Sequence, residues 1–383
     1  MPHADFDIAI LGAGPVGSAL ALLLAQHAPQ PECIALIAKP STSVDRTDDA
    51  PDPRALALNH GSIQLLKQIH AHSGVAAPIR TVHVSQKGRL GRTLIQASEL
   101  DVDMLGAVVT YPNVVEALNS ALEHSKVTRL IAQHHGRDAL PNQVHTTQGT
   151  IQCGIKVLSD GVRPTGIERH YDQHGLVSII RSRRPQSGWA YERFTQDGPF
   201  ALLPHPAAPD LYALVWCNSP QKTATLKALP DNEFEAQLLQ TFGTRLGKLE
   251  LAGERFVFPL SMYAGPSLPA RHTVAIGNAA QTLHPVAGQG LNLGLRDAAQ
   301  LSHALRPWLL TPDADPSTVL EPYAGKRRLD RWLTTSVTDF LPRAFAVDNS
   351  LIHHAGGLAL LAMDVFEAAR VPLVRHLLQG TRT

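Results

Sequence analysis

Two glycine-rich segments of this chain have the residue types and spacing that bind a dinucleotide. The first, Gly12-Ala13-Gly14-Pro15-Val16-Gly17, follows the apolar run Phe6–Leu11 and precedes an Ala- and Leu-rich run at residues 18–26. In such a turn between strand and helix, the first glycine permits the tight bend, the second lets the backbone approach a pyrophosphate, and the third lets the helix pack on the strand. The N–H groups at the helix start then face the phosphates. Rather than a purely structural turn, we predict a cofactor site at Gly12, Gly14, Pro15, Val16 and Gly17.

The second segment, residues 272–298, combines an apolar strand, a loop with an amide side chain and a glycine turn before a helix. Residues 273–276 are apolar, and residues 291–301 have helical periodicity. Gly288 and Gly290 allow a backbone path that side chains would block. The helix start can stabilise negative charge on a reduced flavin ring, and Asn278 can donate to and accept from ribityl hydroxyls. This combination indicates a flavin site.

The residue that normally holds the adenosine ribose is absent. A dinucleotide-binding fold usually has Asp or Glu about 20 residues beyond the glycines, after the second strand. Here that strand, at residues 33–37, is followed by Ala38 and Lys39. A charge-assisted hydrogen bond of about 1.5–3 kcal/mol is missing, so FAD binds more weakly or another group supplies the contact. Lys39 could alternatively bind the 2′-phosphate of NADP, whereas the second glycine segment favours FAD.

The second segment carries a resemblance to a known family. Residues 277–294 resemble the flavin-contacting motif of the aromatic-hydroxylase flavoproteins, and residues 284–294, His-Pro-Val-Ala-Gly-Gln-Gly-Leu-Asn-Leu-Gly, resemble the ubiquinone-biosynthesis hydroxylases. Most relatives carry Asp where this chain has Asn278. With Asn at this place, residues 277–285 resemble the branch of 2-polyprenyl-6-methoxyphenol hydroxylases. The likeness continues in order over most of the chain, at residues 52–58, 81–85, 192–199, 203–204, 214–217 and 242–248.

The resemblance implies an α/β fold in which a Rossmann-type FAD-binding domain carries an inserted antiparallel-sheet substrate domain and C-terminal helices. It implies that the first glycine segment holds the FAD pyrophosphate, that Arg54 lies beside the flavin, and that Gly277 and Asn278 meet the ribityl chain and phosphate. The residues implied around the flavin ring are Gly288, Gln289, Gly290, Leu291 and Asn292.

The family's middle motif is present only in part. Relatives carry Gly-Ala-Asp-Gly followed closely by Ser and Arg, whereas residues 158–163 here read Leu-Ser-Asp-Gly-Val-Arg. The Asp-Gly core remains, so the resemblance implies that Asp160 contacts the cofactor. The altered flanks and Ala38 both affect the expected affinity for FAD and the expected binding of the nicotinamide reductant.

Four residues are candidates for catalysis. His284 and Pro285 lie next to the implied ring site, where His284 could relay a proton from a phenol or could simply fix the turn. Tyr191 and Arg193, with Trp189 nearby, could line a phenol pocket or could be ordinary half-buried strand residues. The residues leave both choices open.

The order of the motifs suggests that one domain is interrupted by another. Within residues 171–260, short apolar or alternating runs bounded by Pro and Gly predict an antiparallel sheet, at residues 176–180, 189–194, 200–203 and 211–216. We predict an FAD-binding domain at residues 1–70, 100–165 and 265–340, a substrate domain at 71–99 and 171–260, and a C-terminal helical segment at 341–383. The last segment is either an amphipathic surface for a lipid-tailed substrate or partner, or a helix packed on the core.

The activity implied by the resemblance is that of an FAD-dependent NAD(P)H:O2 aromatic monooxygenase. NADPH or NADH would reduce FAD, O2 would form a flavin C4a-hydroperoxide, and oxygen would pass to a phenol of the 2-polyprenyl-6-methoxyphenol type in ubiquinone biosynthesis. One alternative is a hydroxylase of a soluble aromatic acid, which needs cationic residues in its pocket. Another is a degenerate flavoprotein that serves as a binding partner.

Composition restricts the partners and the compartment. The chain has 34 Lys and Arg against 33 Asp and Glu, a net charge of +1, which gives no electrostatic footprint for nucleic acid. Cys33, Cys153 and Cys217 are odd in number and far apart, which predicts free thiols and no metal site. No apolar run reaches the roughly 20 residues of a membrane span. We expect a cytoplasmic enzyme, with peripheral contact to the inner face of the membrane or to pathway enzymes as an option and with a homo-oligomer left open.

Overall fold

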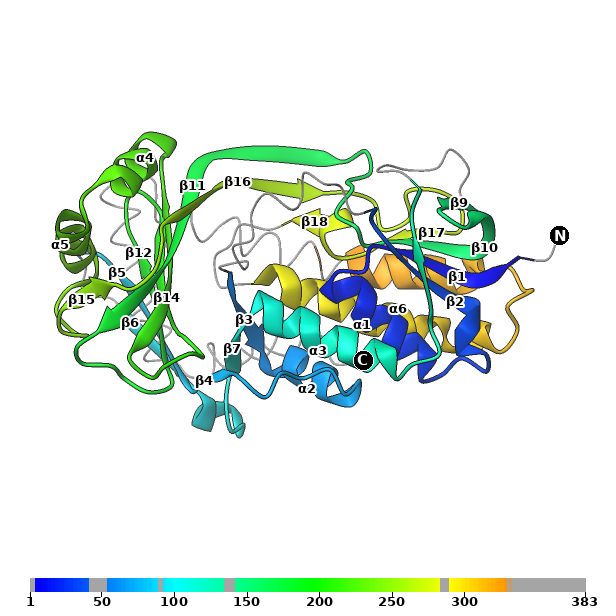
Figure 1. Cartoon of the computed structure of the whole chain (residues 1–383), viewed down its shortest axis with the longest axis horizontal. Coiled ribbons are helices and arrows are strands. Elements are labelled where there is room, and N and C mark those ends of the chain that lie inside the picture. The colour runs from blue at the N-terminus through cyan, green and yellow to red at the C-terminus, as the bar shows by residue number, and fades with distance from the viewer. Residues whose placement is uncertain are drawn as a thin grey trace.

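The structure of the chain is a computed structural model. It describes residues 4–40, 54–88, 92–133, 142–282, 289–328 and 331. Figure 1 shows an elongated molecule with a helix-covered parallel sheet at one end and a large, mostly antiparallel sheet at the other. Residues 41–53 and the predicted C-terminal helical segment at 341–383 lie outside the described residues.

The first sheet is built from parallel strands in the order β17-β10-β1-β2-β8, with β9 added antiparallel to β10. Parallel strands are buried on both faces, and their sequences accordingly read as continuous apolar runs. The strands are β1 (Phe6–Leu11), β2 (Ile34–Ala38), β8 (Thr128–Ile131), β9 (Gln143–Thr146), β10 (Gly149–Leu158) and β17 (Thr273–Ala275). The second strand begins at Ile34, one residue later than predicted, because Pro31–Cys33 form a 3-10 turn.

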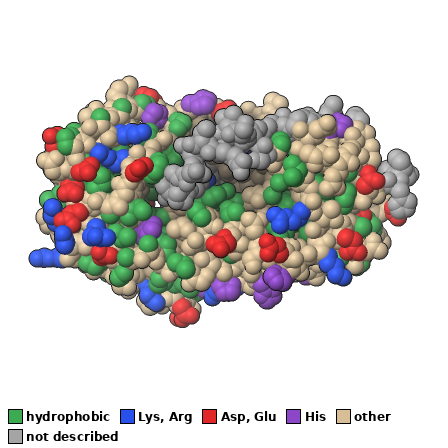
Figure 2. Space-filling model, viewed as in Figure 1, with side chains coloured by type: hydrophobic (Ala, Val, Ile, Leu, Met, Phe, Trp, Pro, Cys, Tyr) green, Lys and Arg blue, Asp and Glu red, His purple; other side chains and the backbone are tan. Residues whose placement is uncertain are grey.

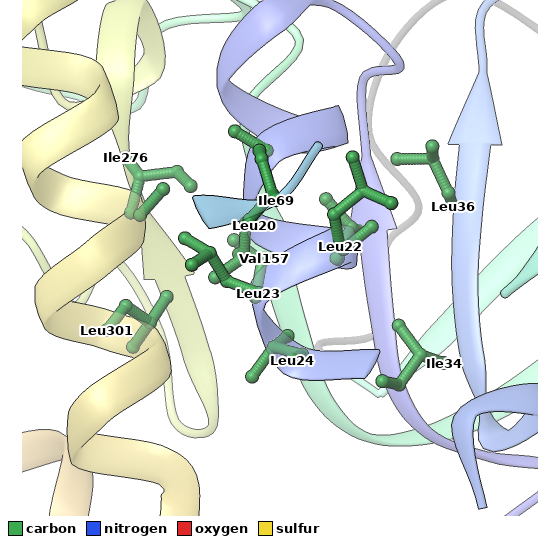
Figure 3. Packing of buried hydrophobic residues seen from close by; sticks show 14 of the residues in the cluster. Leu20, Leu22, Leu23, Leu24, Ile34, Leu36, Ile69, Val157, Ile276 and Leu301 are labelled. Atoms are coloured by element: carbon green, nitrogen blue, oxygen red, sulfur yellow. The ribbon is translucent and has the colours of Figure 1, made fainter. Parts of the chain in front are cut away.

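Helices α1 (Pro15–Ala25), α3 (Tyr111–Glu123) and α6 (Gln289–Leu309) pack together beside this sheet. Every residue of α1 from Gly17 to Leu24 is buried, so this helix is apolar on all sides. Figure 3 shows Leu20, Leu23 and Leu24 pointing among Val157, Ile276 and Leu301 of the neighbouring elements. Since a buried leucine contributes roughly 1.5–3 kcal/mol, this core fixes the position of the glycine turn that precedes α1.

The second sheet has the strand order β18-β16-β11-β14-β13-β12-β5-β6, with β15 paired to β11. Its strands are β5 (Thr81–Gln86), β6 (Arg92–Gln96), β11 (Ile167–Ser182), β12 (Trp189–Phe194), β13 (Pro199–Pro204), β14 (Leu211–Asn218), β15 (Leu249–Leu251), β16 (Phe256–Ala264) and β18 (Gln281–Thr282). The four runs predicted as strands fall in β11, β12, β13 and β14, which pair antiparallel. By contrast, β12 and β5, which comes from an earlier segment of the chain, pair in parallel.

Helices α4 (Pro220–Ala228) and α5 (Asp231–Phe242) lie at the far end of the molecule against the second sheet. An apolar cluster that includes Phe200, Trp216 and Phe234 fills the space between them. The long strands β11 and β16 run from this end back to the parallel-sheet end, as Figure 1 shows. The sheet therefore continues past residue 260, to Ala264 of β16 and to β18; the boundaries of the two domains remain a prediction.

A small third sheet lies between the two ends of the molecule (Figure 1). It consists of β3 (Ala55–Asn59), β7 (Gly106–Thr110) and β4 (Ala77–Ile79), paired antiparallel, with α2 (His60–Gln68) following β3. Short 3-10 turns occur at Ala97–Leu100 and Gly277–Ala279, and residues 317–328 are helical. On the face drawn in Figure 2, positive and negative side chains are interspersed.

Two further features of the described residues concern membranes and metal ions. None of the helices within these ranges is long and apolar enough to cross a membrane. No three His, Cys, Asp or Glu residues of the described chain are grouped so that they could hold a metal ion.

Candidate cofactor site

The first glycine segment lies where β1 ends and α1 begins, and its three glycines have different surroundings. Gly12 has a φ of +112°, and a β-carbon there would lie 2.6 Å from the Asp160 backbone. A β-carbon on Gly17 would lie 2.0 Å from the Gly12 carbonyl oxygen. At Gly14, a β-carbon would have nothing within 4 Å. Gly12 and Gly17 therefore serve packing, whereas Gly14 leaves open backbone for a ligand.

The start of α1 is suited to an anion. Gly14 is its N-cap residue, no side chain caps the helix, and the first turn contains no acidic residue. Pro15 occupies the first turn, where its missing N–H costs no hydrogen bond. The remaining N–H groups and the positive end of the helix dipole can therefore bind a phosphate.

Ser159 holds the glycine turn from the other side. Its backbone N–H donates to the Leu11 carbonyl at 2.8 Å, and its hydroxyl lies 2.9 Å from that oxygen and 3.0 Å from the Gly12 carbonyl. The neighbouring Asp160 accepts from the Val162 N–H at 3.1 Å through Oδ1. Sequence reasoning noted Ser159 only as a departure from the family motif, but its place at the end of a strand, before Asp-Gly, was the available signal.

Val16 joins the two glycine segments. A β-carbon on Gly277, which has a φ of +55°, would lie 3.2 Å from both Val16 methyl carbons. A β-carbon on Gly294, in the second turn of α6, would lie 2.6 Å from Val16 Cγ2. The side chain of Val16 thus occupies space left by two glycines that are far away in sequence. The two glycine segments therefore lie against each other.

Several predicted contacts face outward at this junction. Asn278 is exposed between the buried residues Gly277 and Ala279, and Gly290 near the start of α6 is exposed with open space where a β-carbon would be. Leu291 is half-buried. These groups are accessible to a ligand, as a cofactor contact requires.

Two other predicted cofactor residues contact protein groups. Asn292 accepts from the Asn59 N–H at 2.9 Å and donates to the Ala57 carbonyl at 2.8 Å, which ties α6 to β3. The Arg54 guanidinium lies 4.5 Å from the centre of the Tyr111 ring, just before β3 begins. Asn292 therefore holds α6 against β3, the strand that begins directly after Arg54. The contact of Asn292 with the cofactor stays a prediction.

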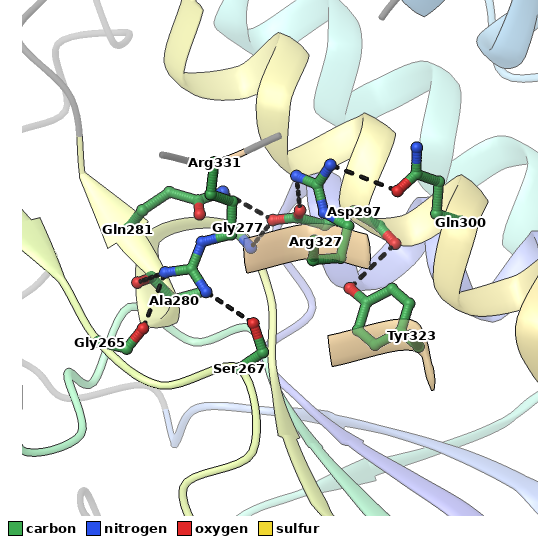
Figure 4. Close-up of polar contacts among 10 residues, drawn as sticks. All are labelled: Gly265, Ser267, Gly277, Ala280, Gln281, Asp297, Gln300, Tyr323, Arg327 and Arg331. Carbon is green, nitrogen blue, oxygen red and sulfur yellow. Dashed lines mark hydrogen bonds and ion pairs between the residues drawn. The ribbon is translucent and has the colours of Figure 1, made fainter. Parts of the chain in front are cut away.

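A buried ionic network holds the Gly277 segment against α6 (Figure 4). Asp297 is 1% exposed, and its Oδ2 accepts from the Gly277 N–H at 3.0 Å and from Gln281 Nε2 at 2.8 Å. Its Oδ1 forms an ion pair with Arg327, which is completely buried. The sequence does not reveal this pair, because the two residues lie 30 positions apart and Arg327 is outside both glycine segments.

Arg331 supports the same loop from its other side. Its guanidinium donates to the carbonyl oxygens of Gly265 and Ala280 at 2.9 and 2.6 Å and to the Ser267 hydroxyl at 2.7 Å (Figure 4). Burial lowers the pKa of Arg331 despite the nearby Asp297 carboxylate. The backbone that presents Asn278 is therefore held by charged side chains on both sides.

The structure does not bring Tyr191 and Arg193 to this site. Tyr191 is 2% exposed and packs edge-on against Phe242 of α5, at 5.2 Å between ring centres, and burial raises the pKa of its hydroxyl. Arg193 donates to the Phe242 carbonyl at 2.9 Å. Both side chains lie on the face of β12 that α5 covers, since alternate residues of a strand share a face. This geometry gives no support to their predicted role in a phenol pocket.

Three of the predicted residues cannot be placed. His284, Pro285 and Gly288 lie outside the described residues. Gln289 begins α6. The proposed role of His284 as a proton relay therefore stays a prediction, as does the contact of this loop with the flavin ring.

Comparison with known proteins connects this site with flavin chemistry. A family model described as FAD binding domain matches residues 5–336. The chain is 30% identical to 3-demethoxyubiquinol 3-hydroxylase of Escherichia coli, over 95% of this chain and 96% of that protein. It is 25% identical to the human mitochondrial ubiquinone biosynthesis monooxygenase COQ6, over 90% of this chain and 86% of that protein.

Solved structures share the fold. The p-nitrophenol 4-monooxygenase PnpA of Pseudomonas putida superposes with a TM-score of 0.74 at 15% identity and covers 99% of both chains. A variant of Klebsiella pneumoniae HpxO complexed with FAD has a TM-score of 0.71 at 14% identity, covering 99% of this chain and 100% of that chain.

Proposed function

From the premise that this chain belongs to the family of FAD-dependent aromatic hydroxylases, we propose that it hydroxylates a polyprenylated phenol of the 2-polyprenyl-6-methoxyphenol type in ubiquinone biosynthesis. Membership makes the protein an FAD-dependent monooxygenase. The proposal adds the substrate class, the lipid tail and the pathway step.

The observation that carries the substrate class is the similarity to the E. coli 3-demethoxyubiquinol 3-hydroxylase along nearly the whole of both chains. The similarity to human COQ6 extends over most of both chains and concerns the same pathway. The solved structures support only the fold, because their sequence identity is low. Two relatives acting in ubiquinone formation favour a phenol precursor of a quinone over a soluble aromatic acid.

The residues at the glycine junction fit FAD. The uncapped start of α1 and the open backbone at Gly14 can hold the pyrophosphate, and the exposed amide of Asn278 can bind ribityl hydroxyls. FAD, once reduced by NADPH or NADH, supplies the activation of O2 that side chains cannot provide. We propose Asp297, Arg327 and Arg331 as positioning residues that fix the Asn278 backbone.

A lipid-tailed phenol also sets demands on the protein around its ring. Water beside the reacting ring would divert reduced flavin toward peroxide, so the pocket must be mainly apolar with few polar groups. The face of β12 opposite α5 begins with Ala190, which packs with Ala77 and Ile79 of β4. We propose that this face borders the phenol. Because such a substrate hardly dissolves, we also propose its delivery from a membrane surface or from other enzymes of the pathway.

The test is to purify the protein with FAD and follow NADPH oxidation with and without a short-chain 2-prenyl-6-methoxyphenol. We expect the phenol to accelerate NADPH oxidation and to gain one oxygen atom, as measured by mass spectrometry. 4-Hydroxybenzoate serves as the soluble aromatic acid for comparison. Hydroxylation of this acid in place of the prenylated phenol would overturn the proposed substrate class.

A further inference from the structure

Glu192 lies on the face of the second sheet that α5 does not cover. In β12 it pairs with Ala201 of β13 and with Val84 of β5. Its neighbours Tyr191 and Arg193 point toward α5, so alternation places Glu192 on the same face as Ala190. That face looks toward the small sheet.

The small sheet connects this face with the cofactor site. Ala190 packs in one apolar cluster with Ala55 and Ala57 of β3. The Ala57 carbonyl accepts the hydrogen bond from Asn292 of α6, the helix whose start faces the junction of the two glycine segments. Glu192 is therefore directed to the side of the sheet on which the cofactor site lies.

The Glu192 carboxyl has no hydrogen bond or ion pair among the described residues, which is unusual for a group set so deep in the protein. Burial alone raises its pKa from 4.5 to about 8. The residue nevertheless keeps part of its surface accessible. Glu192 can therefore still be reached by a small molecule.

The surroundings of Glu192 on its face are small and apolar. On this face, the described residues of β5, β13 and β14 include one ionisable side chain, the Cys217 thiol of β14, whose pKa is raised by burial and by the nearby Glu192. Beside Glu192 on this face lie Val84 of β5 and Ala201 of β13, and Ala55 and Ala57 of β3 pack in the cluster of Ala190. A single carboxyl in an apolar lining suits a flat aromatic ring with one hydroxyl.

We propose that Glu192 binds the phenolic hydroxyl of the substrate and accepts its proton as the ring is hydroxylated. This inference rests on the proposed function and assigns a catalytic residue to it. The O–H bond of the phenol breaks, a bond between that proton and a Glu192 carboxylate oxygen forms, and the electron pair remains on the phenolate oxygen. The phenolate donates this pair into the ring, which makes the ring carbon a stronger nucleophile, and Glu192 then returns the proton to product or solvent.

The strength of the acid fits this task. A phenol has a pKa of about 10, as tyrosine does, so an ordinary glutamate would be a weak acceptor. Burial brings the pKa of Glu192 to about 8, much closer to that of its proton donor. General bases work best when their pKa lies near the operating pH.

The decisive experiment compares Glu192→Gln with the wild type, using NADPH and a short-chain 2-prenyl-6-methoxyphenol from pH 6 to about 10. We expect kcat/KM of the variant to fall roughly 10²–10⁴-fold at neutral pH. The fall should shrink at high pH, where the phenol ionises without a base. FAD content should stay unchanged, and the exposed Glu254→Gln should behave as wild type in every respect.

The other outcomes distinguish failure of the proposed function from failure of the role assigned to Glu192. If the wild type never hydroxylates the phenol, the proposed function fails. If the wild type does and Glu192→Gln keeps its rate and pH profile, only the role of Glu192 is overturned. If Glu192→Gln does not fold, the deciding measurement is the affinity of the wild-type protein for the phenol, followed by the change in flavin absorbance. This affinity must change with an apparent pKa near 8. An affinity that is independent of pH overturns the inference.

Discussion

At the scale of single residues, the three glycines of the first segment separate packing from binding. A methyl group at Gly17 would collide with the Gly12 carbonyl, whereas one at Gly14 would meet only open space. We predict that Gly17→Ala destabilises the FAD-free protein by about 1–3 kcal/mol, the usual cost of overpacking. Gly14→Ala should leave that stability within about 1 kcal/mol and weaken FAD binding instead.

Denaturant unfolding of FAD-free protein and titration with FAD measure the two effects separately. Equal loss of stability in both variants would show that Gly14 is a packing residue and would remove it from the proposed pyrophosphate site.

Glu192 makes a second prediction at this scale, on the pH dependence of stability. Its pKa in the folded protein is about 8 and its ordinary value is 4.5, so the folded state holds the proton more tightly. The stabilisation is complete below pH 4.5 and is lost as pH rises to about 8. We expect the wild type to lose a few kcal/mol over this window, at no more than about 1.4 kcal/mol per pH unit.

Glu192→Gln should lack this contribution, so the stability difference between the two proteins should change with pH in that window. The measurement is urea unfolding at several pH values, with Glu254→Gln as the control. A constant difference between Glu192→Gln and wild type would mean that the Glu192 carboxyl ionises as it does in water.

At the scale of elements, α6 and the Gly277 turn are held together by Asp297. Its carboxylate satisfies the Gly277 N–H and the buried Arg327 guanidinium at once. Asp297→Asn leaves Arg327 as a buried charge without its ionic partner, and breaking such a pair costs about 3–5 kcal/mol. We therefore predict a large loss of stability together with weaker FAD binding.

The matched comparison is Asp315→Asn, which removes an exposed carboxylate that pairs with Arg271 and His272. Exposed pairs contribute about 0–1 kcal/mol, so this change should be small. Thermal unfolding of both variants checks the contrast, and a similar effect of the two substitutions would refute the structural importance of Asp297.

The elements also show what sequence reasoning could and could not provide. The first glycine turn, at the junction of β1 and α1, was predictable because local spacing determines it. The face of β12 on which Tyr191 and Arg193 lie was not predictable, since alternation separates two faces without telling which one a helix covers. The parallel pairing of β12 with β5 and the ion pair between Asp297 and Arg327 join distant segments and leave no local pattern.

At the scale of the whole molecule, the chain combines a cofactor end with a sheet that presents one apolar face toward it. Val16 closes the cofactor end by packing against Gly277 and Gly294, and Asn292 ties that end to β3. The strands β11 and β16 extend from one end to the other (Figure 1). Under the proposed function, a reduced flavin at the cofactor end would meet a phenol ring bound against this face of the sheet.

The most direct test of the account is the fate of oxygen in a single reaction. The FAD-loaded protein is supplied with NADPH, a short-chain 2-prenyl-6-methoxyphenol and isotopically heavy O2, and the product is analysed by mass spectrometry. We expect one heavy oxygen atom to enter the ring for each NADPH consumed in productive turnover. Oxidation of NADPH to give only hydrogen peroxide, with the phenol unchanged, would contradict it.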